Sequence, residues 1–181
     1  LFIAVMAASG QLGPPDLDSV FFGELSLSGE VRPVRGILPM VIKAREDGFR
    51  AAYVPAGNAQ EGAVVSGIDV IPVANVRELV EHLRGSRTLS PAVPGDDTTA
   101  PLGPQPDFAE VRGQEEAKRA LEIAAAGGHN VMLIGSPGAG KSMLAKRLPS
   151  ILPDMSFEEM VETTKIHSIA GTLPPGASLV R

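Results

Sequence analysis

The stretch GSPGAGKS, from Gly135 to Ser142, constrains this chain most, because it places three glycines, a lysine and a hydroxyl in eight residues. The apolar run NVMLI precedes it, and SMLAKRLPSIL, which has apolar residues at helical spacing, follows it. Strand, glycine-rich loop and helix in this order are the context in which the pattern G-x-x-x-x-G-K-[ST] binds phosphate. We therefore predict an α/β fold with a buried strand at Asn130–Ile134.

Each position of the pattern has a physical task. Glycine lets the backbone fold around an anion with its N–H groups directed inward, and the following helix adds its positive dipole end. Lys141 is predicted to reach phosphate oxygens and Ser142 to offer its hydroxyl to Mg²⁺. The sequence thus predicts ATP and Mg²⁺ as cofactors. The predicted nucleotide-binding residues are Gly135, Ser136, Pro137, Gly138, Ala139, Gly140, Lys141, Ser142 and Met143.

Hydrolysis would need an apolar strand that ends in an acidic residue. The acids after Ser142 do not follow such a strand, and DMSFEEMVETTKIHS is predicted to be a helix with Ser156 as N-cap and Glu159 completing a capping box. Glu158 and Glu159 are then a solvated helix face. No catalytic residue is visible, and we expect the hydrolytic acids beyond Arg181, in a longer protein of which this chain is a part.

Residues 85–106, GSRTLSPAVPGDDTTAPLGPQP, contain five prolines and no apolar period, which predicts an exposed linker between 1–84 and 107–181. The chain has no cysteine, which excludes disulfide bonds. Its formal net charge of −5 gives it no overall attraction for nucleic acid or anionic lipid. LFIAVMAA is apolar but too short to span a bilayer, and is predicted to be a buried segment. We expect a soluble cytoplasmic protein.

The first half alternates strand and helix patterns. VFFGELSL, from Val20, is a predicted strand that pairs with EVRPV across Ser28-Gly29, and a helix is predicted from Ile37 towards Gly48. AAYVP and DVIPV are predicted strands, and NVRELVEHLRG is a predicted helix with Asn75 as N-cap and His82 on its surface. In the second half, Gln114–Ala126 is the strongest predicted helix.

These residues resemble a known family. VRGQEEAKRALEIAAAGGHNVMLIGSPGAGKSMLAKRLPSILP (111–153) closely resembles the nucleotide-binding module of magnesium-chelatase-like AAA+ ATPases, with the closer match to the competence-related ComM/YifB group. IHSIAGTLPPGASLVR (166–181) is similar to that group as well. The resemblance implies the N-terminal part of a P-loop AAA+ αβα domain at 107–181, in which Val111, Arg112 and Gly113 cup the adenine. It also implies a homo-oligomeric ring, with DNA as a candidate partner.

The first half resembles a second family. GELSLSGEVRPVRGILPMVIKAREDGFRAAYVP (23–55) is similar to the C-terminal part of a Lon-type protease domain, which implies a Lon-protease-like α/β domain at 1–84. The alignment of EVRPVRGIL puts Leu38 where those proteases carry a catalytic lysine, and leucine cannot activate a serine. Lys43 is more than one helical turn further along, and the serine-bearing segment would precede Leu1. We expect this half to be proteolytically inactive, and it precedes the ATPase half, the reverse of the order in bacterial Lon.

The leading hypothesis is a truncated AAA+ ATPase, part of a ring-forming motor for DNA processing in transformation or recombination. Three alternatives stay open. A magnesium chelatase ATPase subunit would lack the Lon-like half, and an active ATP-dependent protease would need a serine–lysine dyad. A non-hydrolysing ATP-binding or scaffold protein would keep the loop without the hydrolytic acids.

Overall fold

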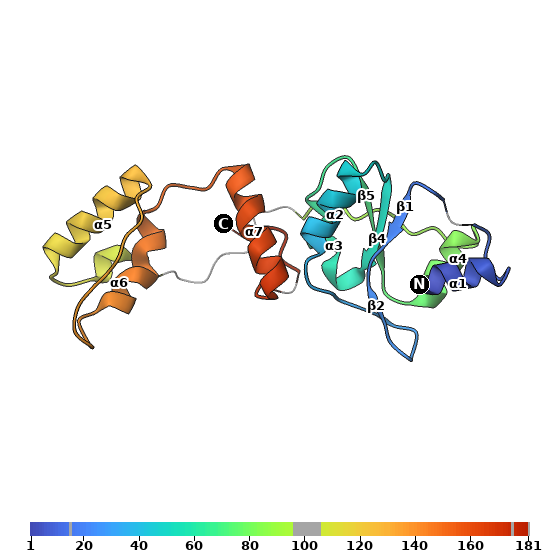
Figure 1. Ribbon diagram of the computed structural model, residues 1–181, viewed down its shortest axis with the longest axis horizontal. Coiled ribbons are helices and arrows are strands. Elements are labelled where there is room, and N and C mark those ends of the chain that lie inside the picture. The colour runs from blue at the N-terminus through green and yellow to red at the C-terminus, as the bar shows by residue number, and fades with distance from the viewer. Residues whose placement is uncertain (15, 96–105, 175, 181) are drawn as a thin grey trace. The chain divides into compact units, whose positions relative to one another are not determined.

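A computed structural model describes residues 1–14, 16–95, 106–174 and 176–180 (Figure 1). The chain forms two compact units. The first unit contains Leu1–Asp97 together with Ser156–Arg181, and the second contains Thr98–Met155. Among the described residues, every helix is too short or too polar to cross a membrane.

The first unit is built on a parallel three-stranded sheet with the order β1-β4-β5. The strands are β1 (Ser19–Phe21), β4 (Ala51–Pro55) and β5 (Asp69–Val73). The predicted strands AAYVP and DVIPV are confirmed, and so is the α/β class. Pro72 lies in the edge strand β5, where a residue without an N–H is tolerated.

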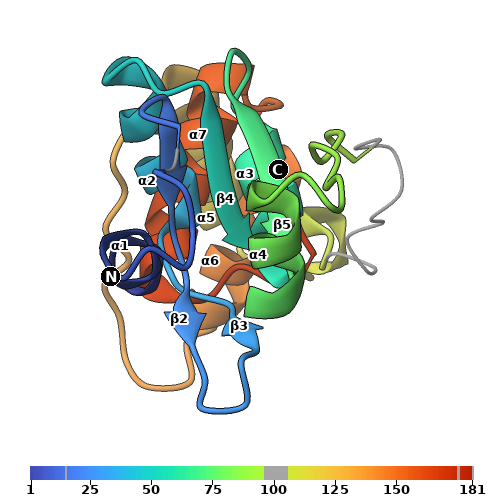
Figure 2. The same cartoon turned by 90° about the vertical axis from the view of Figure 1, so that its right-hand side faces the viewer.

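Helices cover both faces of this sheet (Figure 2). They are α1 (Phe2–Ala8) and α4 (Val76–Leu83) on one face, and α2 (Ile37–Glu46) and α3 (Ala59–Ala63) on the other. Because side chains alternate along a strand, Ala52 and Val54 enter the core under α2, whereas Tyr53 enters the core under α1 and α4. The apolar N-terminal segment is only partly buried: Ile3 is in the core, and Val5 is 57% exposed.

A short antiparallel hairpin, β2 (Glu24–Leu25) and β3 (Val31–Arg32), extends from the sheet. The turn is closed by the Gly29 N–H, which donates to the Ser26 oxygen at 3.0 Å. The sequence predicted this pairing but treated 20–27 as one strand, which is wrong. Gly23, with φ of 144°, separates β1 in the parallel sheet from β2 in the hairpin.

The N-terminus of α2 is capped from a distance. Its N-cap residue is Gly36, which has φ of 80° and no side chain to accept a hydrogen bond. The carboxylate of Glu61, only 6% exposed, accepts the Leu38 N–H at 2.9 Å and the Asn58 side-chain amide at 3.0 Å. Asn58 in turn exchanges two hydrogen bonds of 3.0 Å with the backbone of Val34. This network fixes where α2 begins.

Helix α7 (Phe157–Ala170) packs against α2 within the first unit (Figures 1 and 2). Its buried Ser168 hydroxyl donates a hydrogen bond to the Glu61 carboxylate. The predicted capping box is confirmed: the Ser156 side chain accepts the Glu159 N–H at 3.3 Å, and the Glu159 carboxylate accepts the Ser156 N–H at 2.8 Å. Glu158 and Glu159 are exposed, as the sequence predicted.

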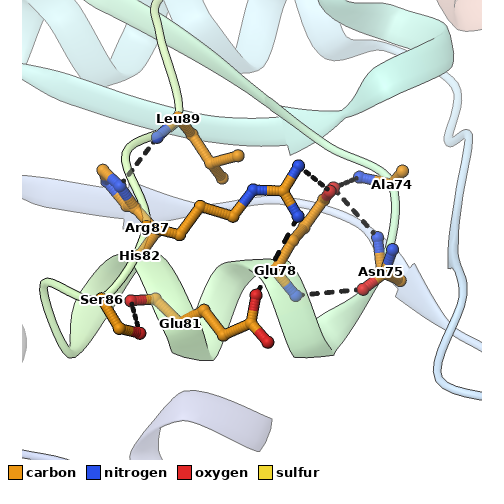
Figure 3. Close-up of polar contacts among 8 residues, drawn as sticks. All are labelled: Ala74, Asn75, Glu78, Glu81, His82, Ser86, Arg87 and Leu89. Carbon is orange, nitrogen blue, oxygen red and sulfur yellow. Dashed lines mark hydrogen bonds and ion pairs between the residues drawn. The ribbon is translucent and has the colours of Figure 1, made fainter.

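Helix α4 begins with a second capping box, which confirms Asn75 as its N-cap (Figure 3). The Asn75 side chain accepts the Glu78 N–H at 3.0 Å, and the Glu78 carboxylate accepts the N–H groups of Asn75 and Ala74. Glu78 also lies 3.6 Å from the Arg87 guanidinium. The carboxylate therefore joins the start of α4 to the segment that follows the helix.

The segment after α4 stays close to the first unit. The Leu89 N–H donates to Nδ1 of His82 at 3.1 Å, and the other ring nitrogen of His82 is 3.0 Å from the Tyr53 hydroxyl. The prediction that His82 is a surface residue is therefore wrong, because both of its ring nitrogens have partners inside the unit. The Ala92 N–H donates to the Val70 oxygen at 2.7 Å, on the edge of β5. The rest of the predicted linker, 96–105, lies outside the described residues.

The second unit consists of helices around a small apolar core. Its elements are η2 (Phe108–Glu110), α5 (Glu115–Gly127), α6 (Lys141–Arg147) and η3 (Leu148–Ile151). Its buried core residues are Phe108, Val111, Leu121 and Leu144. Arg147 forms a 2.8 Å ion pair with Glu110. The predicted helix at Gln114–Ala126 is confirmed with a shift of one residue.

The predicted buried strand at Asn130–Ile134 is wrong. These residues form no strand, and Met132 and Ile134 are 80% and 83% exposed. A strand needs a neighbour to satisfy its N–H and C=O groups, and the described part of this unit contains no strand that could pair with it. Leu133 alone packs against the core of the unit.

We expect Glu61→Ala to lower the free energy of unfolding of the first unit by about 2–4 kcal/mol. The substitution leaves the buried Leu38 N–H and Asn58 amide without their acceptor. Urea unfolding followed by circular dichroism measures the loss. The control is Glu46→Ala, an exposed acid on α2, which should change stability by under about 0.5 kcal/mol. Equal losses in the two variants would mean that the buried network adds nothing.

The capping box of α7 predicts a pH dependence. Hydrogen bonds from the backbone N–H and the side chain of Ser156 hold the pKa of Glu159 below its ordinary value of 4.5. A lowered folded-state pKa contributes stability that is complete above pH 4.5 and is lost as the pH falls through the folded-state value. Carboxyl-carbon NMR of Glu159 should give a pKa that moves part of the way back in Ser156→Ala, where the backbone N–H remains. An unmoved pKa would contradict the side-chain contribution.

Candidate functional site

The glycine-rich loop lies in the second unit, directly before α6. Residues 135–139 are exposed, and Gly138 and Gly140 have φ values of 82° and 81°. Only glycine adopts this left-handed region without steric cost. The Ala139 N–H donates to the Ser136 oxygen at 3.3 Å, which closes the loop on itself. The backbone thus has the curvature that the sequence pattern predicted.

Lys141 extends into this loop from the first residue of α6. Its ammonium donates to the carbonyl oxygens of Gly135 at 2.9 Å and Ser136 at 2.8 Å. Among the described residues, no carboxylate lies within ion-pair distance of this ammonium. Ser142 and Met143 follow in the first turn of the helix and are exposed. The site therefore presents one cation without a charged partner beside a curved backbone, an arrangement that suits an anion.

The second predicted group, Val111, Arg112 and Gly113, precedes α5. The Val111 side chain is 2% exposed and belongs to the core of the unit, whereas Arg112 and Gly113 are exposed. The loop meets this group through the next residue, Gln114, whose side-chain amide donates to the Ala139 oxygen at 3.3 Å. The sequence prediction missed Gln114. A glutamine is an unusual N-cap, and this signal could have marked the position.

Metal-binding clusters are absent from the described residues: no three His, Asp or Glu side chains gather closely enough to hold an ion. His129 is exposed at the end of α5, and Nδ1 of His167 lies 2.8 Å from the Thr172 hydroxyl. Any metal at this site would therefore depend on Ser142 and on oxygens that a ligand supplies.

The first unit contains Leu38 and Lys43, the two residues compared above with the catalytic lysine of Lon-type proteases. Leu38 is fully buried in the core. Lys43 lies on the exposed side of α2, with its ammonium 2.7 Å from Asp47. The hydrogen bond to Asp47 and the charge of Asp47 raise the pKa of Lys43.

Two family models match separate parts of the chain. The family model described as magnesium chelatase, subunit ChlI, matches residues 107–180, and the model described as subunit ChlI of Mg-chelatase matches residues 1–58. The uncharacterized protein YifB of Escherichia coli is 40% identical over 168 residues, which cover 92% of this chain and 33% of YifB. The competence protein ComM of Haemophilus influenzae is 36% identical over 178 residues, with the same coverage of each chain.

A shorter match concerns proteases. The archaeal Lon protease of Methanothermobacter thermautotrophicus is 38% identical over 71 residues, which cover 37% of this chain and 11% of that protein. The chain spans about a third of the length of its longer relatives, YifB and ComM.

The two stretches that match the chelatase-subunit models contain the glycine-rich loop and helix α2. They define a magnesium-chelatase-like protein. Within that class, identity to YifB and ComM extends over 92% of the chain, which includes residues outside both models. The chain belongs to the ComM/YifB type of magnesium-chelatase-like proteins.

We expect Leu38→Lys to lower the free energy of unfolding by about 2–5 kcal/mol and to create no peptidase activity. The new ammonium would be buried in the apolar core under α2. Met40→Lys, on the same helix but at a residue 40% exposed, should be nearly neutral. Urea unfolding and hydrolysis of fluorescent casein measure the two effects. Casein hydrolysis by the Leu38→Lys variant would contradict this expectation.

Proposed function

We propose that this chain carries the nucleotide-binding part of an AAA+ ATPase and binds ATP with Mg²⁺ through Gly135–Met143. The observation that carries the proposal is Lys141, whose ammonium is held inside the curved loop by two neutral carbonyl oxygens. Phosphate oxygens are stronger acceptors for an ammonium than carbonyl oxygens, since the hydrogen bond is then charge-assisted on both sides. The absence of an acidic partner among the described residues fits the same ligand.

In this proposal, different residues contact different parts of the ligand. Backbone N–H groups of the loop and Lys141 hold the phosphates, Ser142 is the Mg²⁺ ligand, and Val111, Arg112 and Gly113 lie on the adenine side. Mg²⁺ bound with the nucleotide supplies charge neutralisation of the phosphates. None of residues 1–181 is assigned to the hydrolysis step.

The proposal also covers the domain organisation of the chain and the role of the whole protein. In it, 1–84 is a Lon-like domain without protease activity, 85–106 a linker, and 107–181 the first part of the AAA+ domain of a cytoplasmic, ring-forming protein. The match to an archaeal Lon protease and the position of Leu38 support the first assignment. The name of the competence protein ComM supports DNA processing in transformation as the work of the whole protein.

A magnesium chelatase ATPase subunit is the second candidate, because both matching family models are described by that enzyme. The two candidates share the nucleotide site and differ in the substrate of the whole assembly. Identity to YifB and ComM over 92% of the chain favours the first.

Lys141→Ala should weaken ATP binding by about ten- to a hundredfold, since it removes a charge-assisted contact to phosphate. Titration of the chain with a fluorescent ATP analogue in the presence of Mg²⁺ measures the affinity. Lys146→Ala is the matched control, because Lys146 has the same charge, lies on the same helix and is exposed. The proposal fails if the parent chain binds no ATP, or if the two variants bind it equally well.

A further inference from the structure

Gln114 has a backbone conformation that, among the described residues, is otherwise adopted only by glycines. Its φ is 57°, and every other described residue with positive φ is a glycine. Such a conformation costs a non-glycine residue on the order of 1–2 kcal/mol. Contacts that need this backbone conformation must offset the cost, and the side chain of Gln114 contacts the glycine-rich loop.

The side chain of Gln114 lies against the last peptide of the loop. Its Nε2 donates to the Ala139 carbonyl oxygen at 3.3 Å, although the two residues are 25 apart in sequence. A Cβ atom built on Gly140 would lie 2.9 Å from the same Nε2, so the amide also covers the Cα of Gly140. Gln114 thus contacts both residues of the Ala139–Gly140 peptide, directly before Lys141.

This contact fixes the direction of one N–H group. A trans peptide is planar, and its C=O and N–H point in opposite directions. The described chain contains no cis peptide, and the Ala139 carbonyl points at Gln114. The Gly140 N–H therefore points away from Gln114. If this peptide flipped, its carbonyl would take the place of that N–H and would repel an anion.

We propose that Gln114 is a positioning residue of the phosphate loop, which holds the Gly140 N–H in the orientation that binds the phosphate chain of a nucleotide. This inference rests on the proposed function. Gln114 acts through the peptide and does not itself contact the ligand. It also directly follows Val111–Gly113 in sequence, so one residue links the adenine side of the site to the phosphate side.

The test uses Gln114→Gly and Gln114→Asn. Both residues accept the left-handed backbone, so the strain is relieved and the variants fold. Glycine has no side-chain amide, and the side chain of asparagine is one methylene too short for its amide to reach Ala139. Affinities for inorganic tripolyphosphate, for adenosine and for ATP are measured by isothermal titration calorimetry on the parent chain and both variants.

We expect both variants to bind tripolyphosphate and ATP about three- to tenfold more weakly and adenosine as the parent does, with unchanged or higher melting temperatures. Unchanged tripolyphosphate affinity would overturn the inference and leave Gln114 as a helix N-cap only. An equal loss for adenosine and tripolyphosphate would also overturn it, since a general distortion of the unit would explain both. A parent chain that binds neither ATP nor tripolyphosphate would instead overturn the proposed function.

Discussion

The first unit depends on one buried carboxylate. An ionised side chain removed from water costs several kcal/mol unless hydrogen bonds replace its hydration. Glu61 receives such bonds from the Leu38 N–H, from Asn58 and from Ser168, and it lies at the positive end of α2. Because these donors belong to different segments, the carboxylate sets the position of α2, of the turn before it and of α7 at once. Gly36 has no capping side chain, and this carboxylate accepts the Leu38 N–H in its place.

The same network is compatible with an apolar side chain at position 38. The carboxylate that accepts the Leu38 N–H is already satisfied by backbone, amide and hydroxyl donors, so it needs no cation nearby. The side chain of Leu38 is then free to complete the apolar core with Ile37 and Val41. This half also contacts α7, the helix that follows the second unit along the chain. The hydrogen bond between Glu61 and Ser168 joins this half to that helix.

Sequence patterns predicted the features that depend on neighbouring residues. The N-cap at Asn75, the capping box at Ser156 and the curvature at Gly138 and Gly140 are local features of this kind. The features that were missed depend on distant partners. Glu61 reaches Leu38 across 23 residues and Ser168 across 107, and Gln114 reaches Ala139 across 25. The run Asn130–Ile134 has the composition of a strand, but composition cannot supply the neighbouring strand that a ladder requires.

In the proposed function, the partners of Lys141 determine how much a phosphate ligand can gain at the loop. An ammonium paired with a carboxylate would have to give up an ion pair before it could bind phosphate. Lys141 instead gives up two neutral carbonyl acceptors. Replacing these with anionic oxygens strengthens each hydrogen bond, and the cation is already inside the loop, so little side-chain freedom is lost on binding. A loop that is curved by Gly138 and Gly140 and holds its own lysine is thus organised before any ligand arrives.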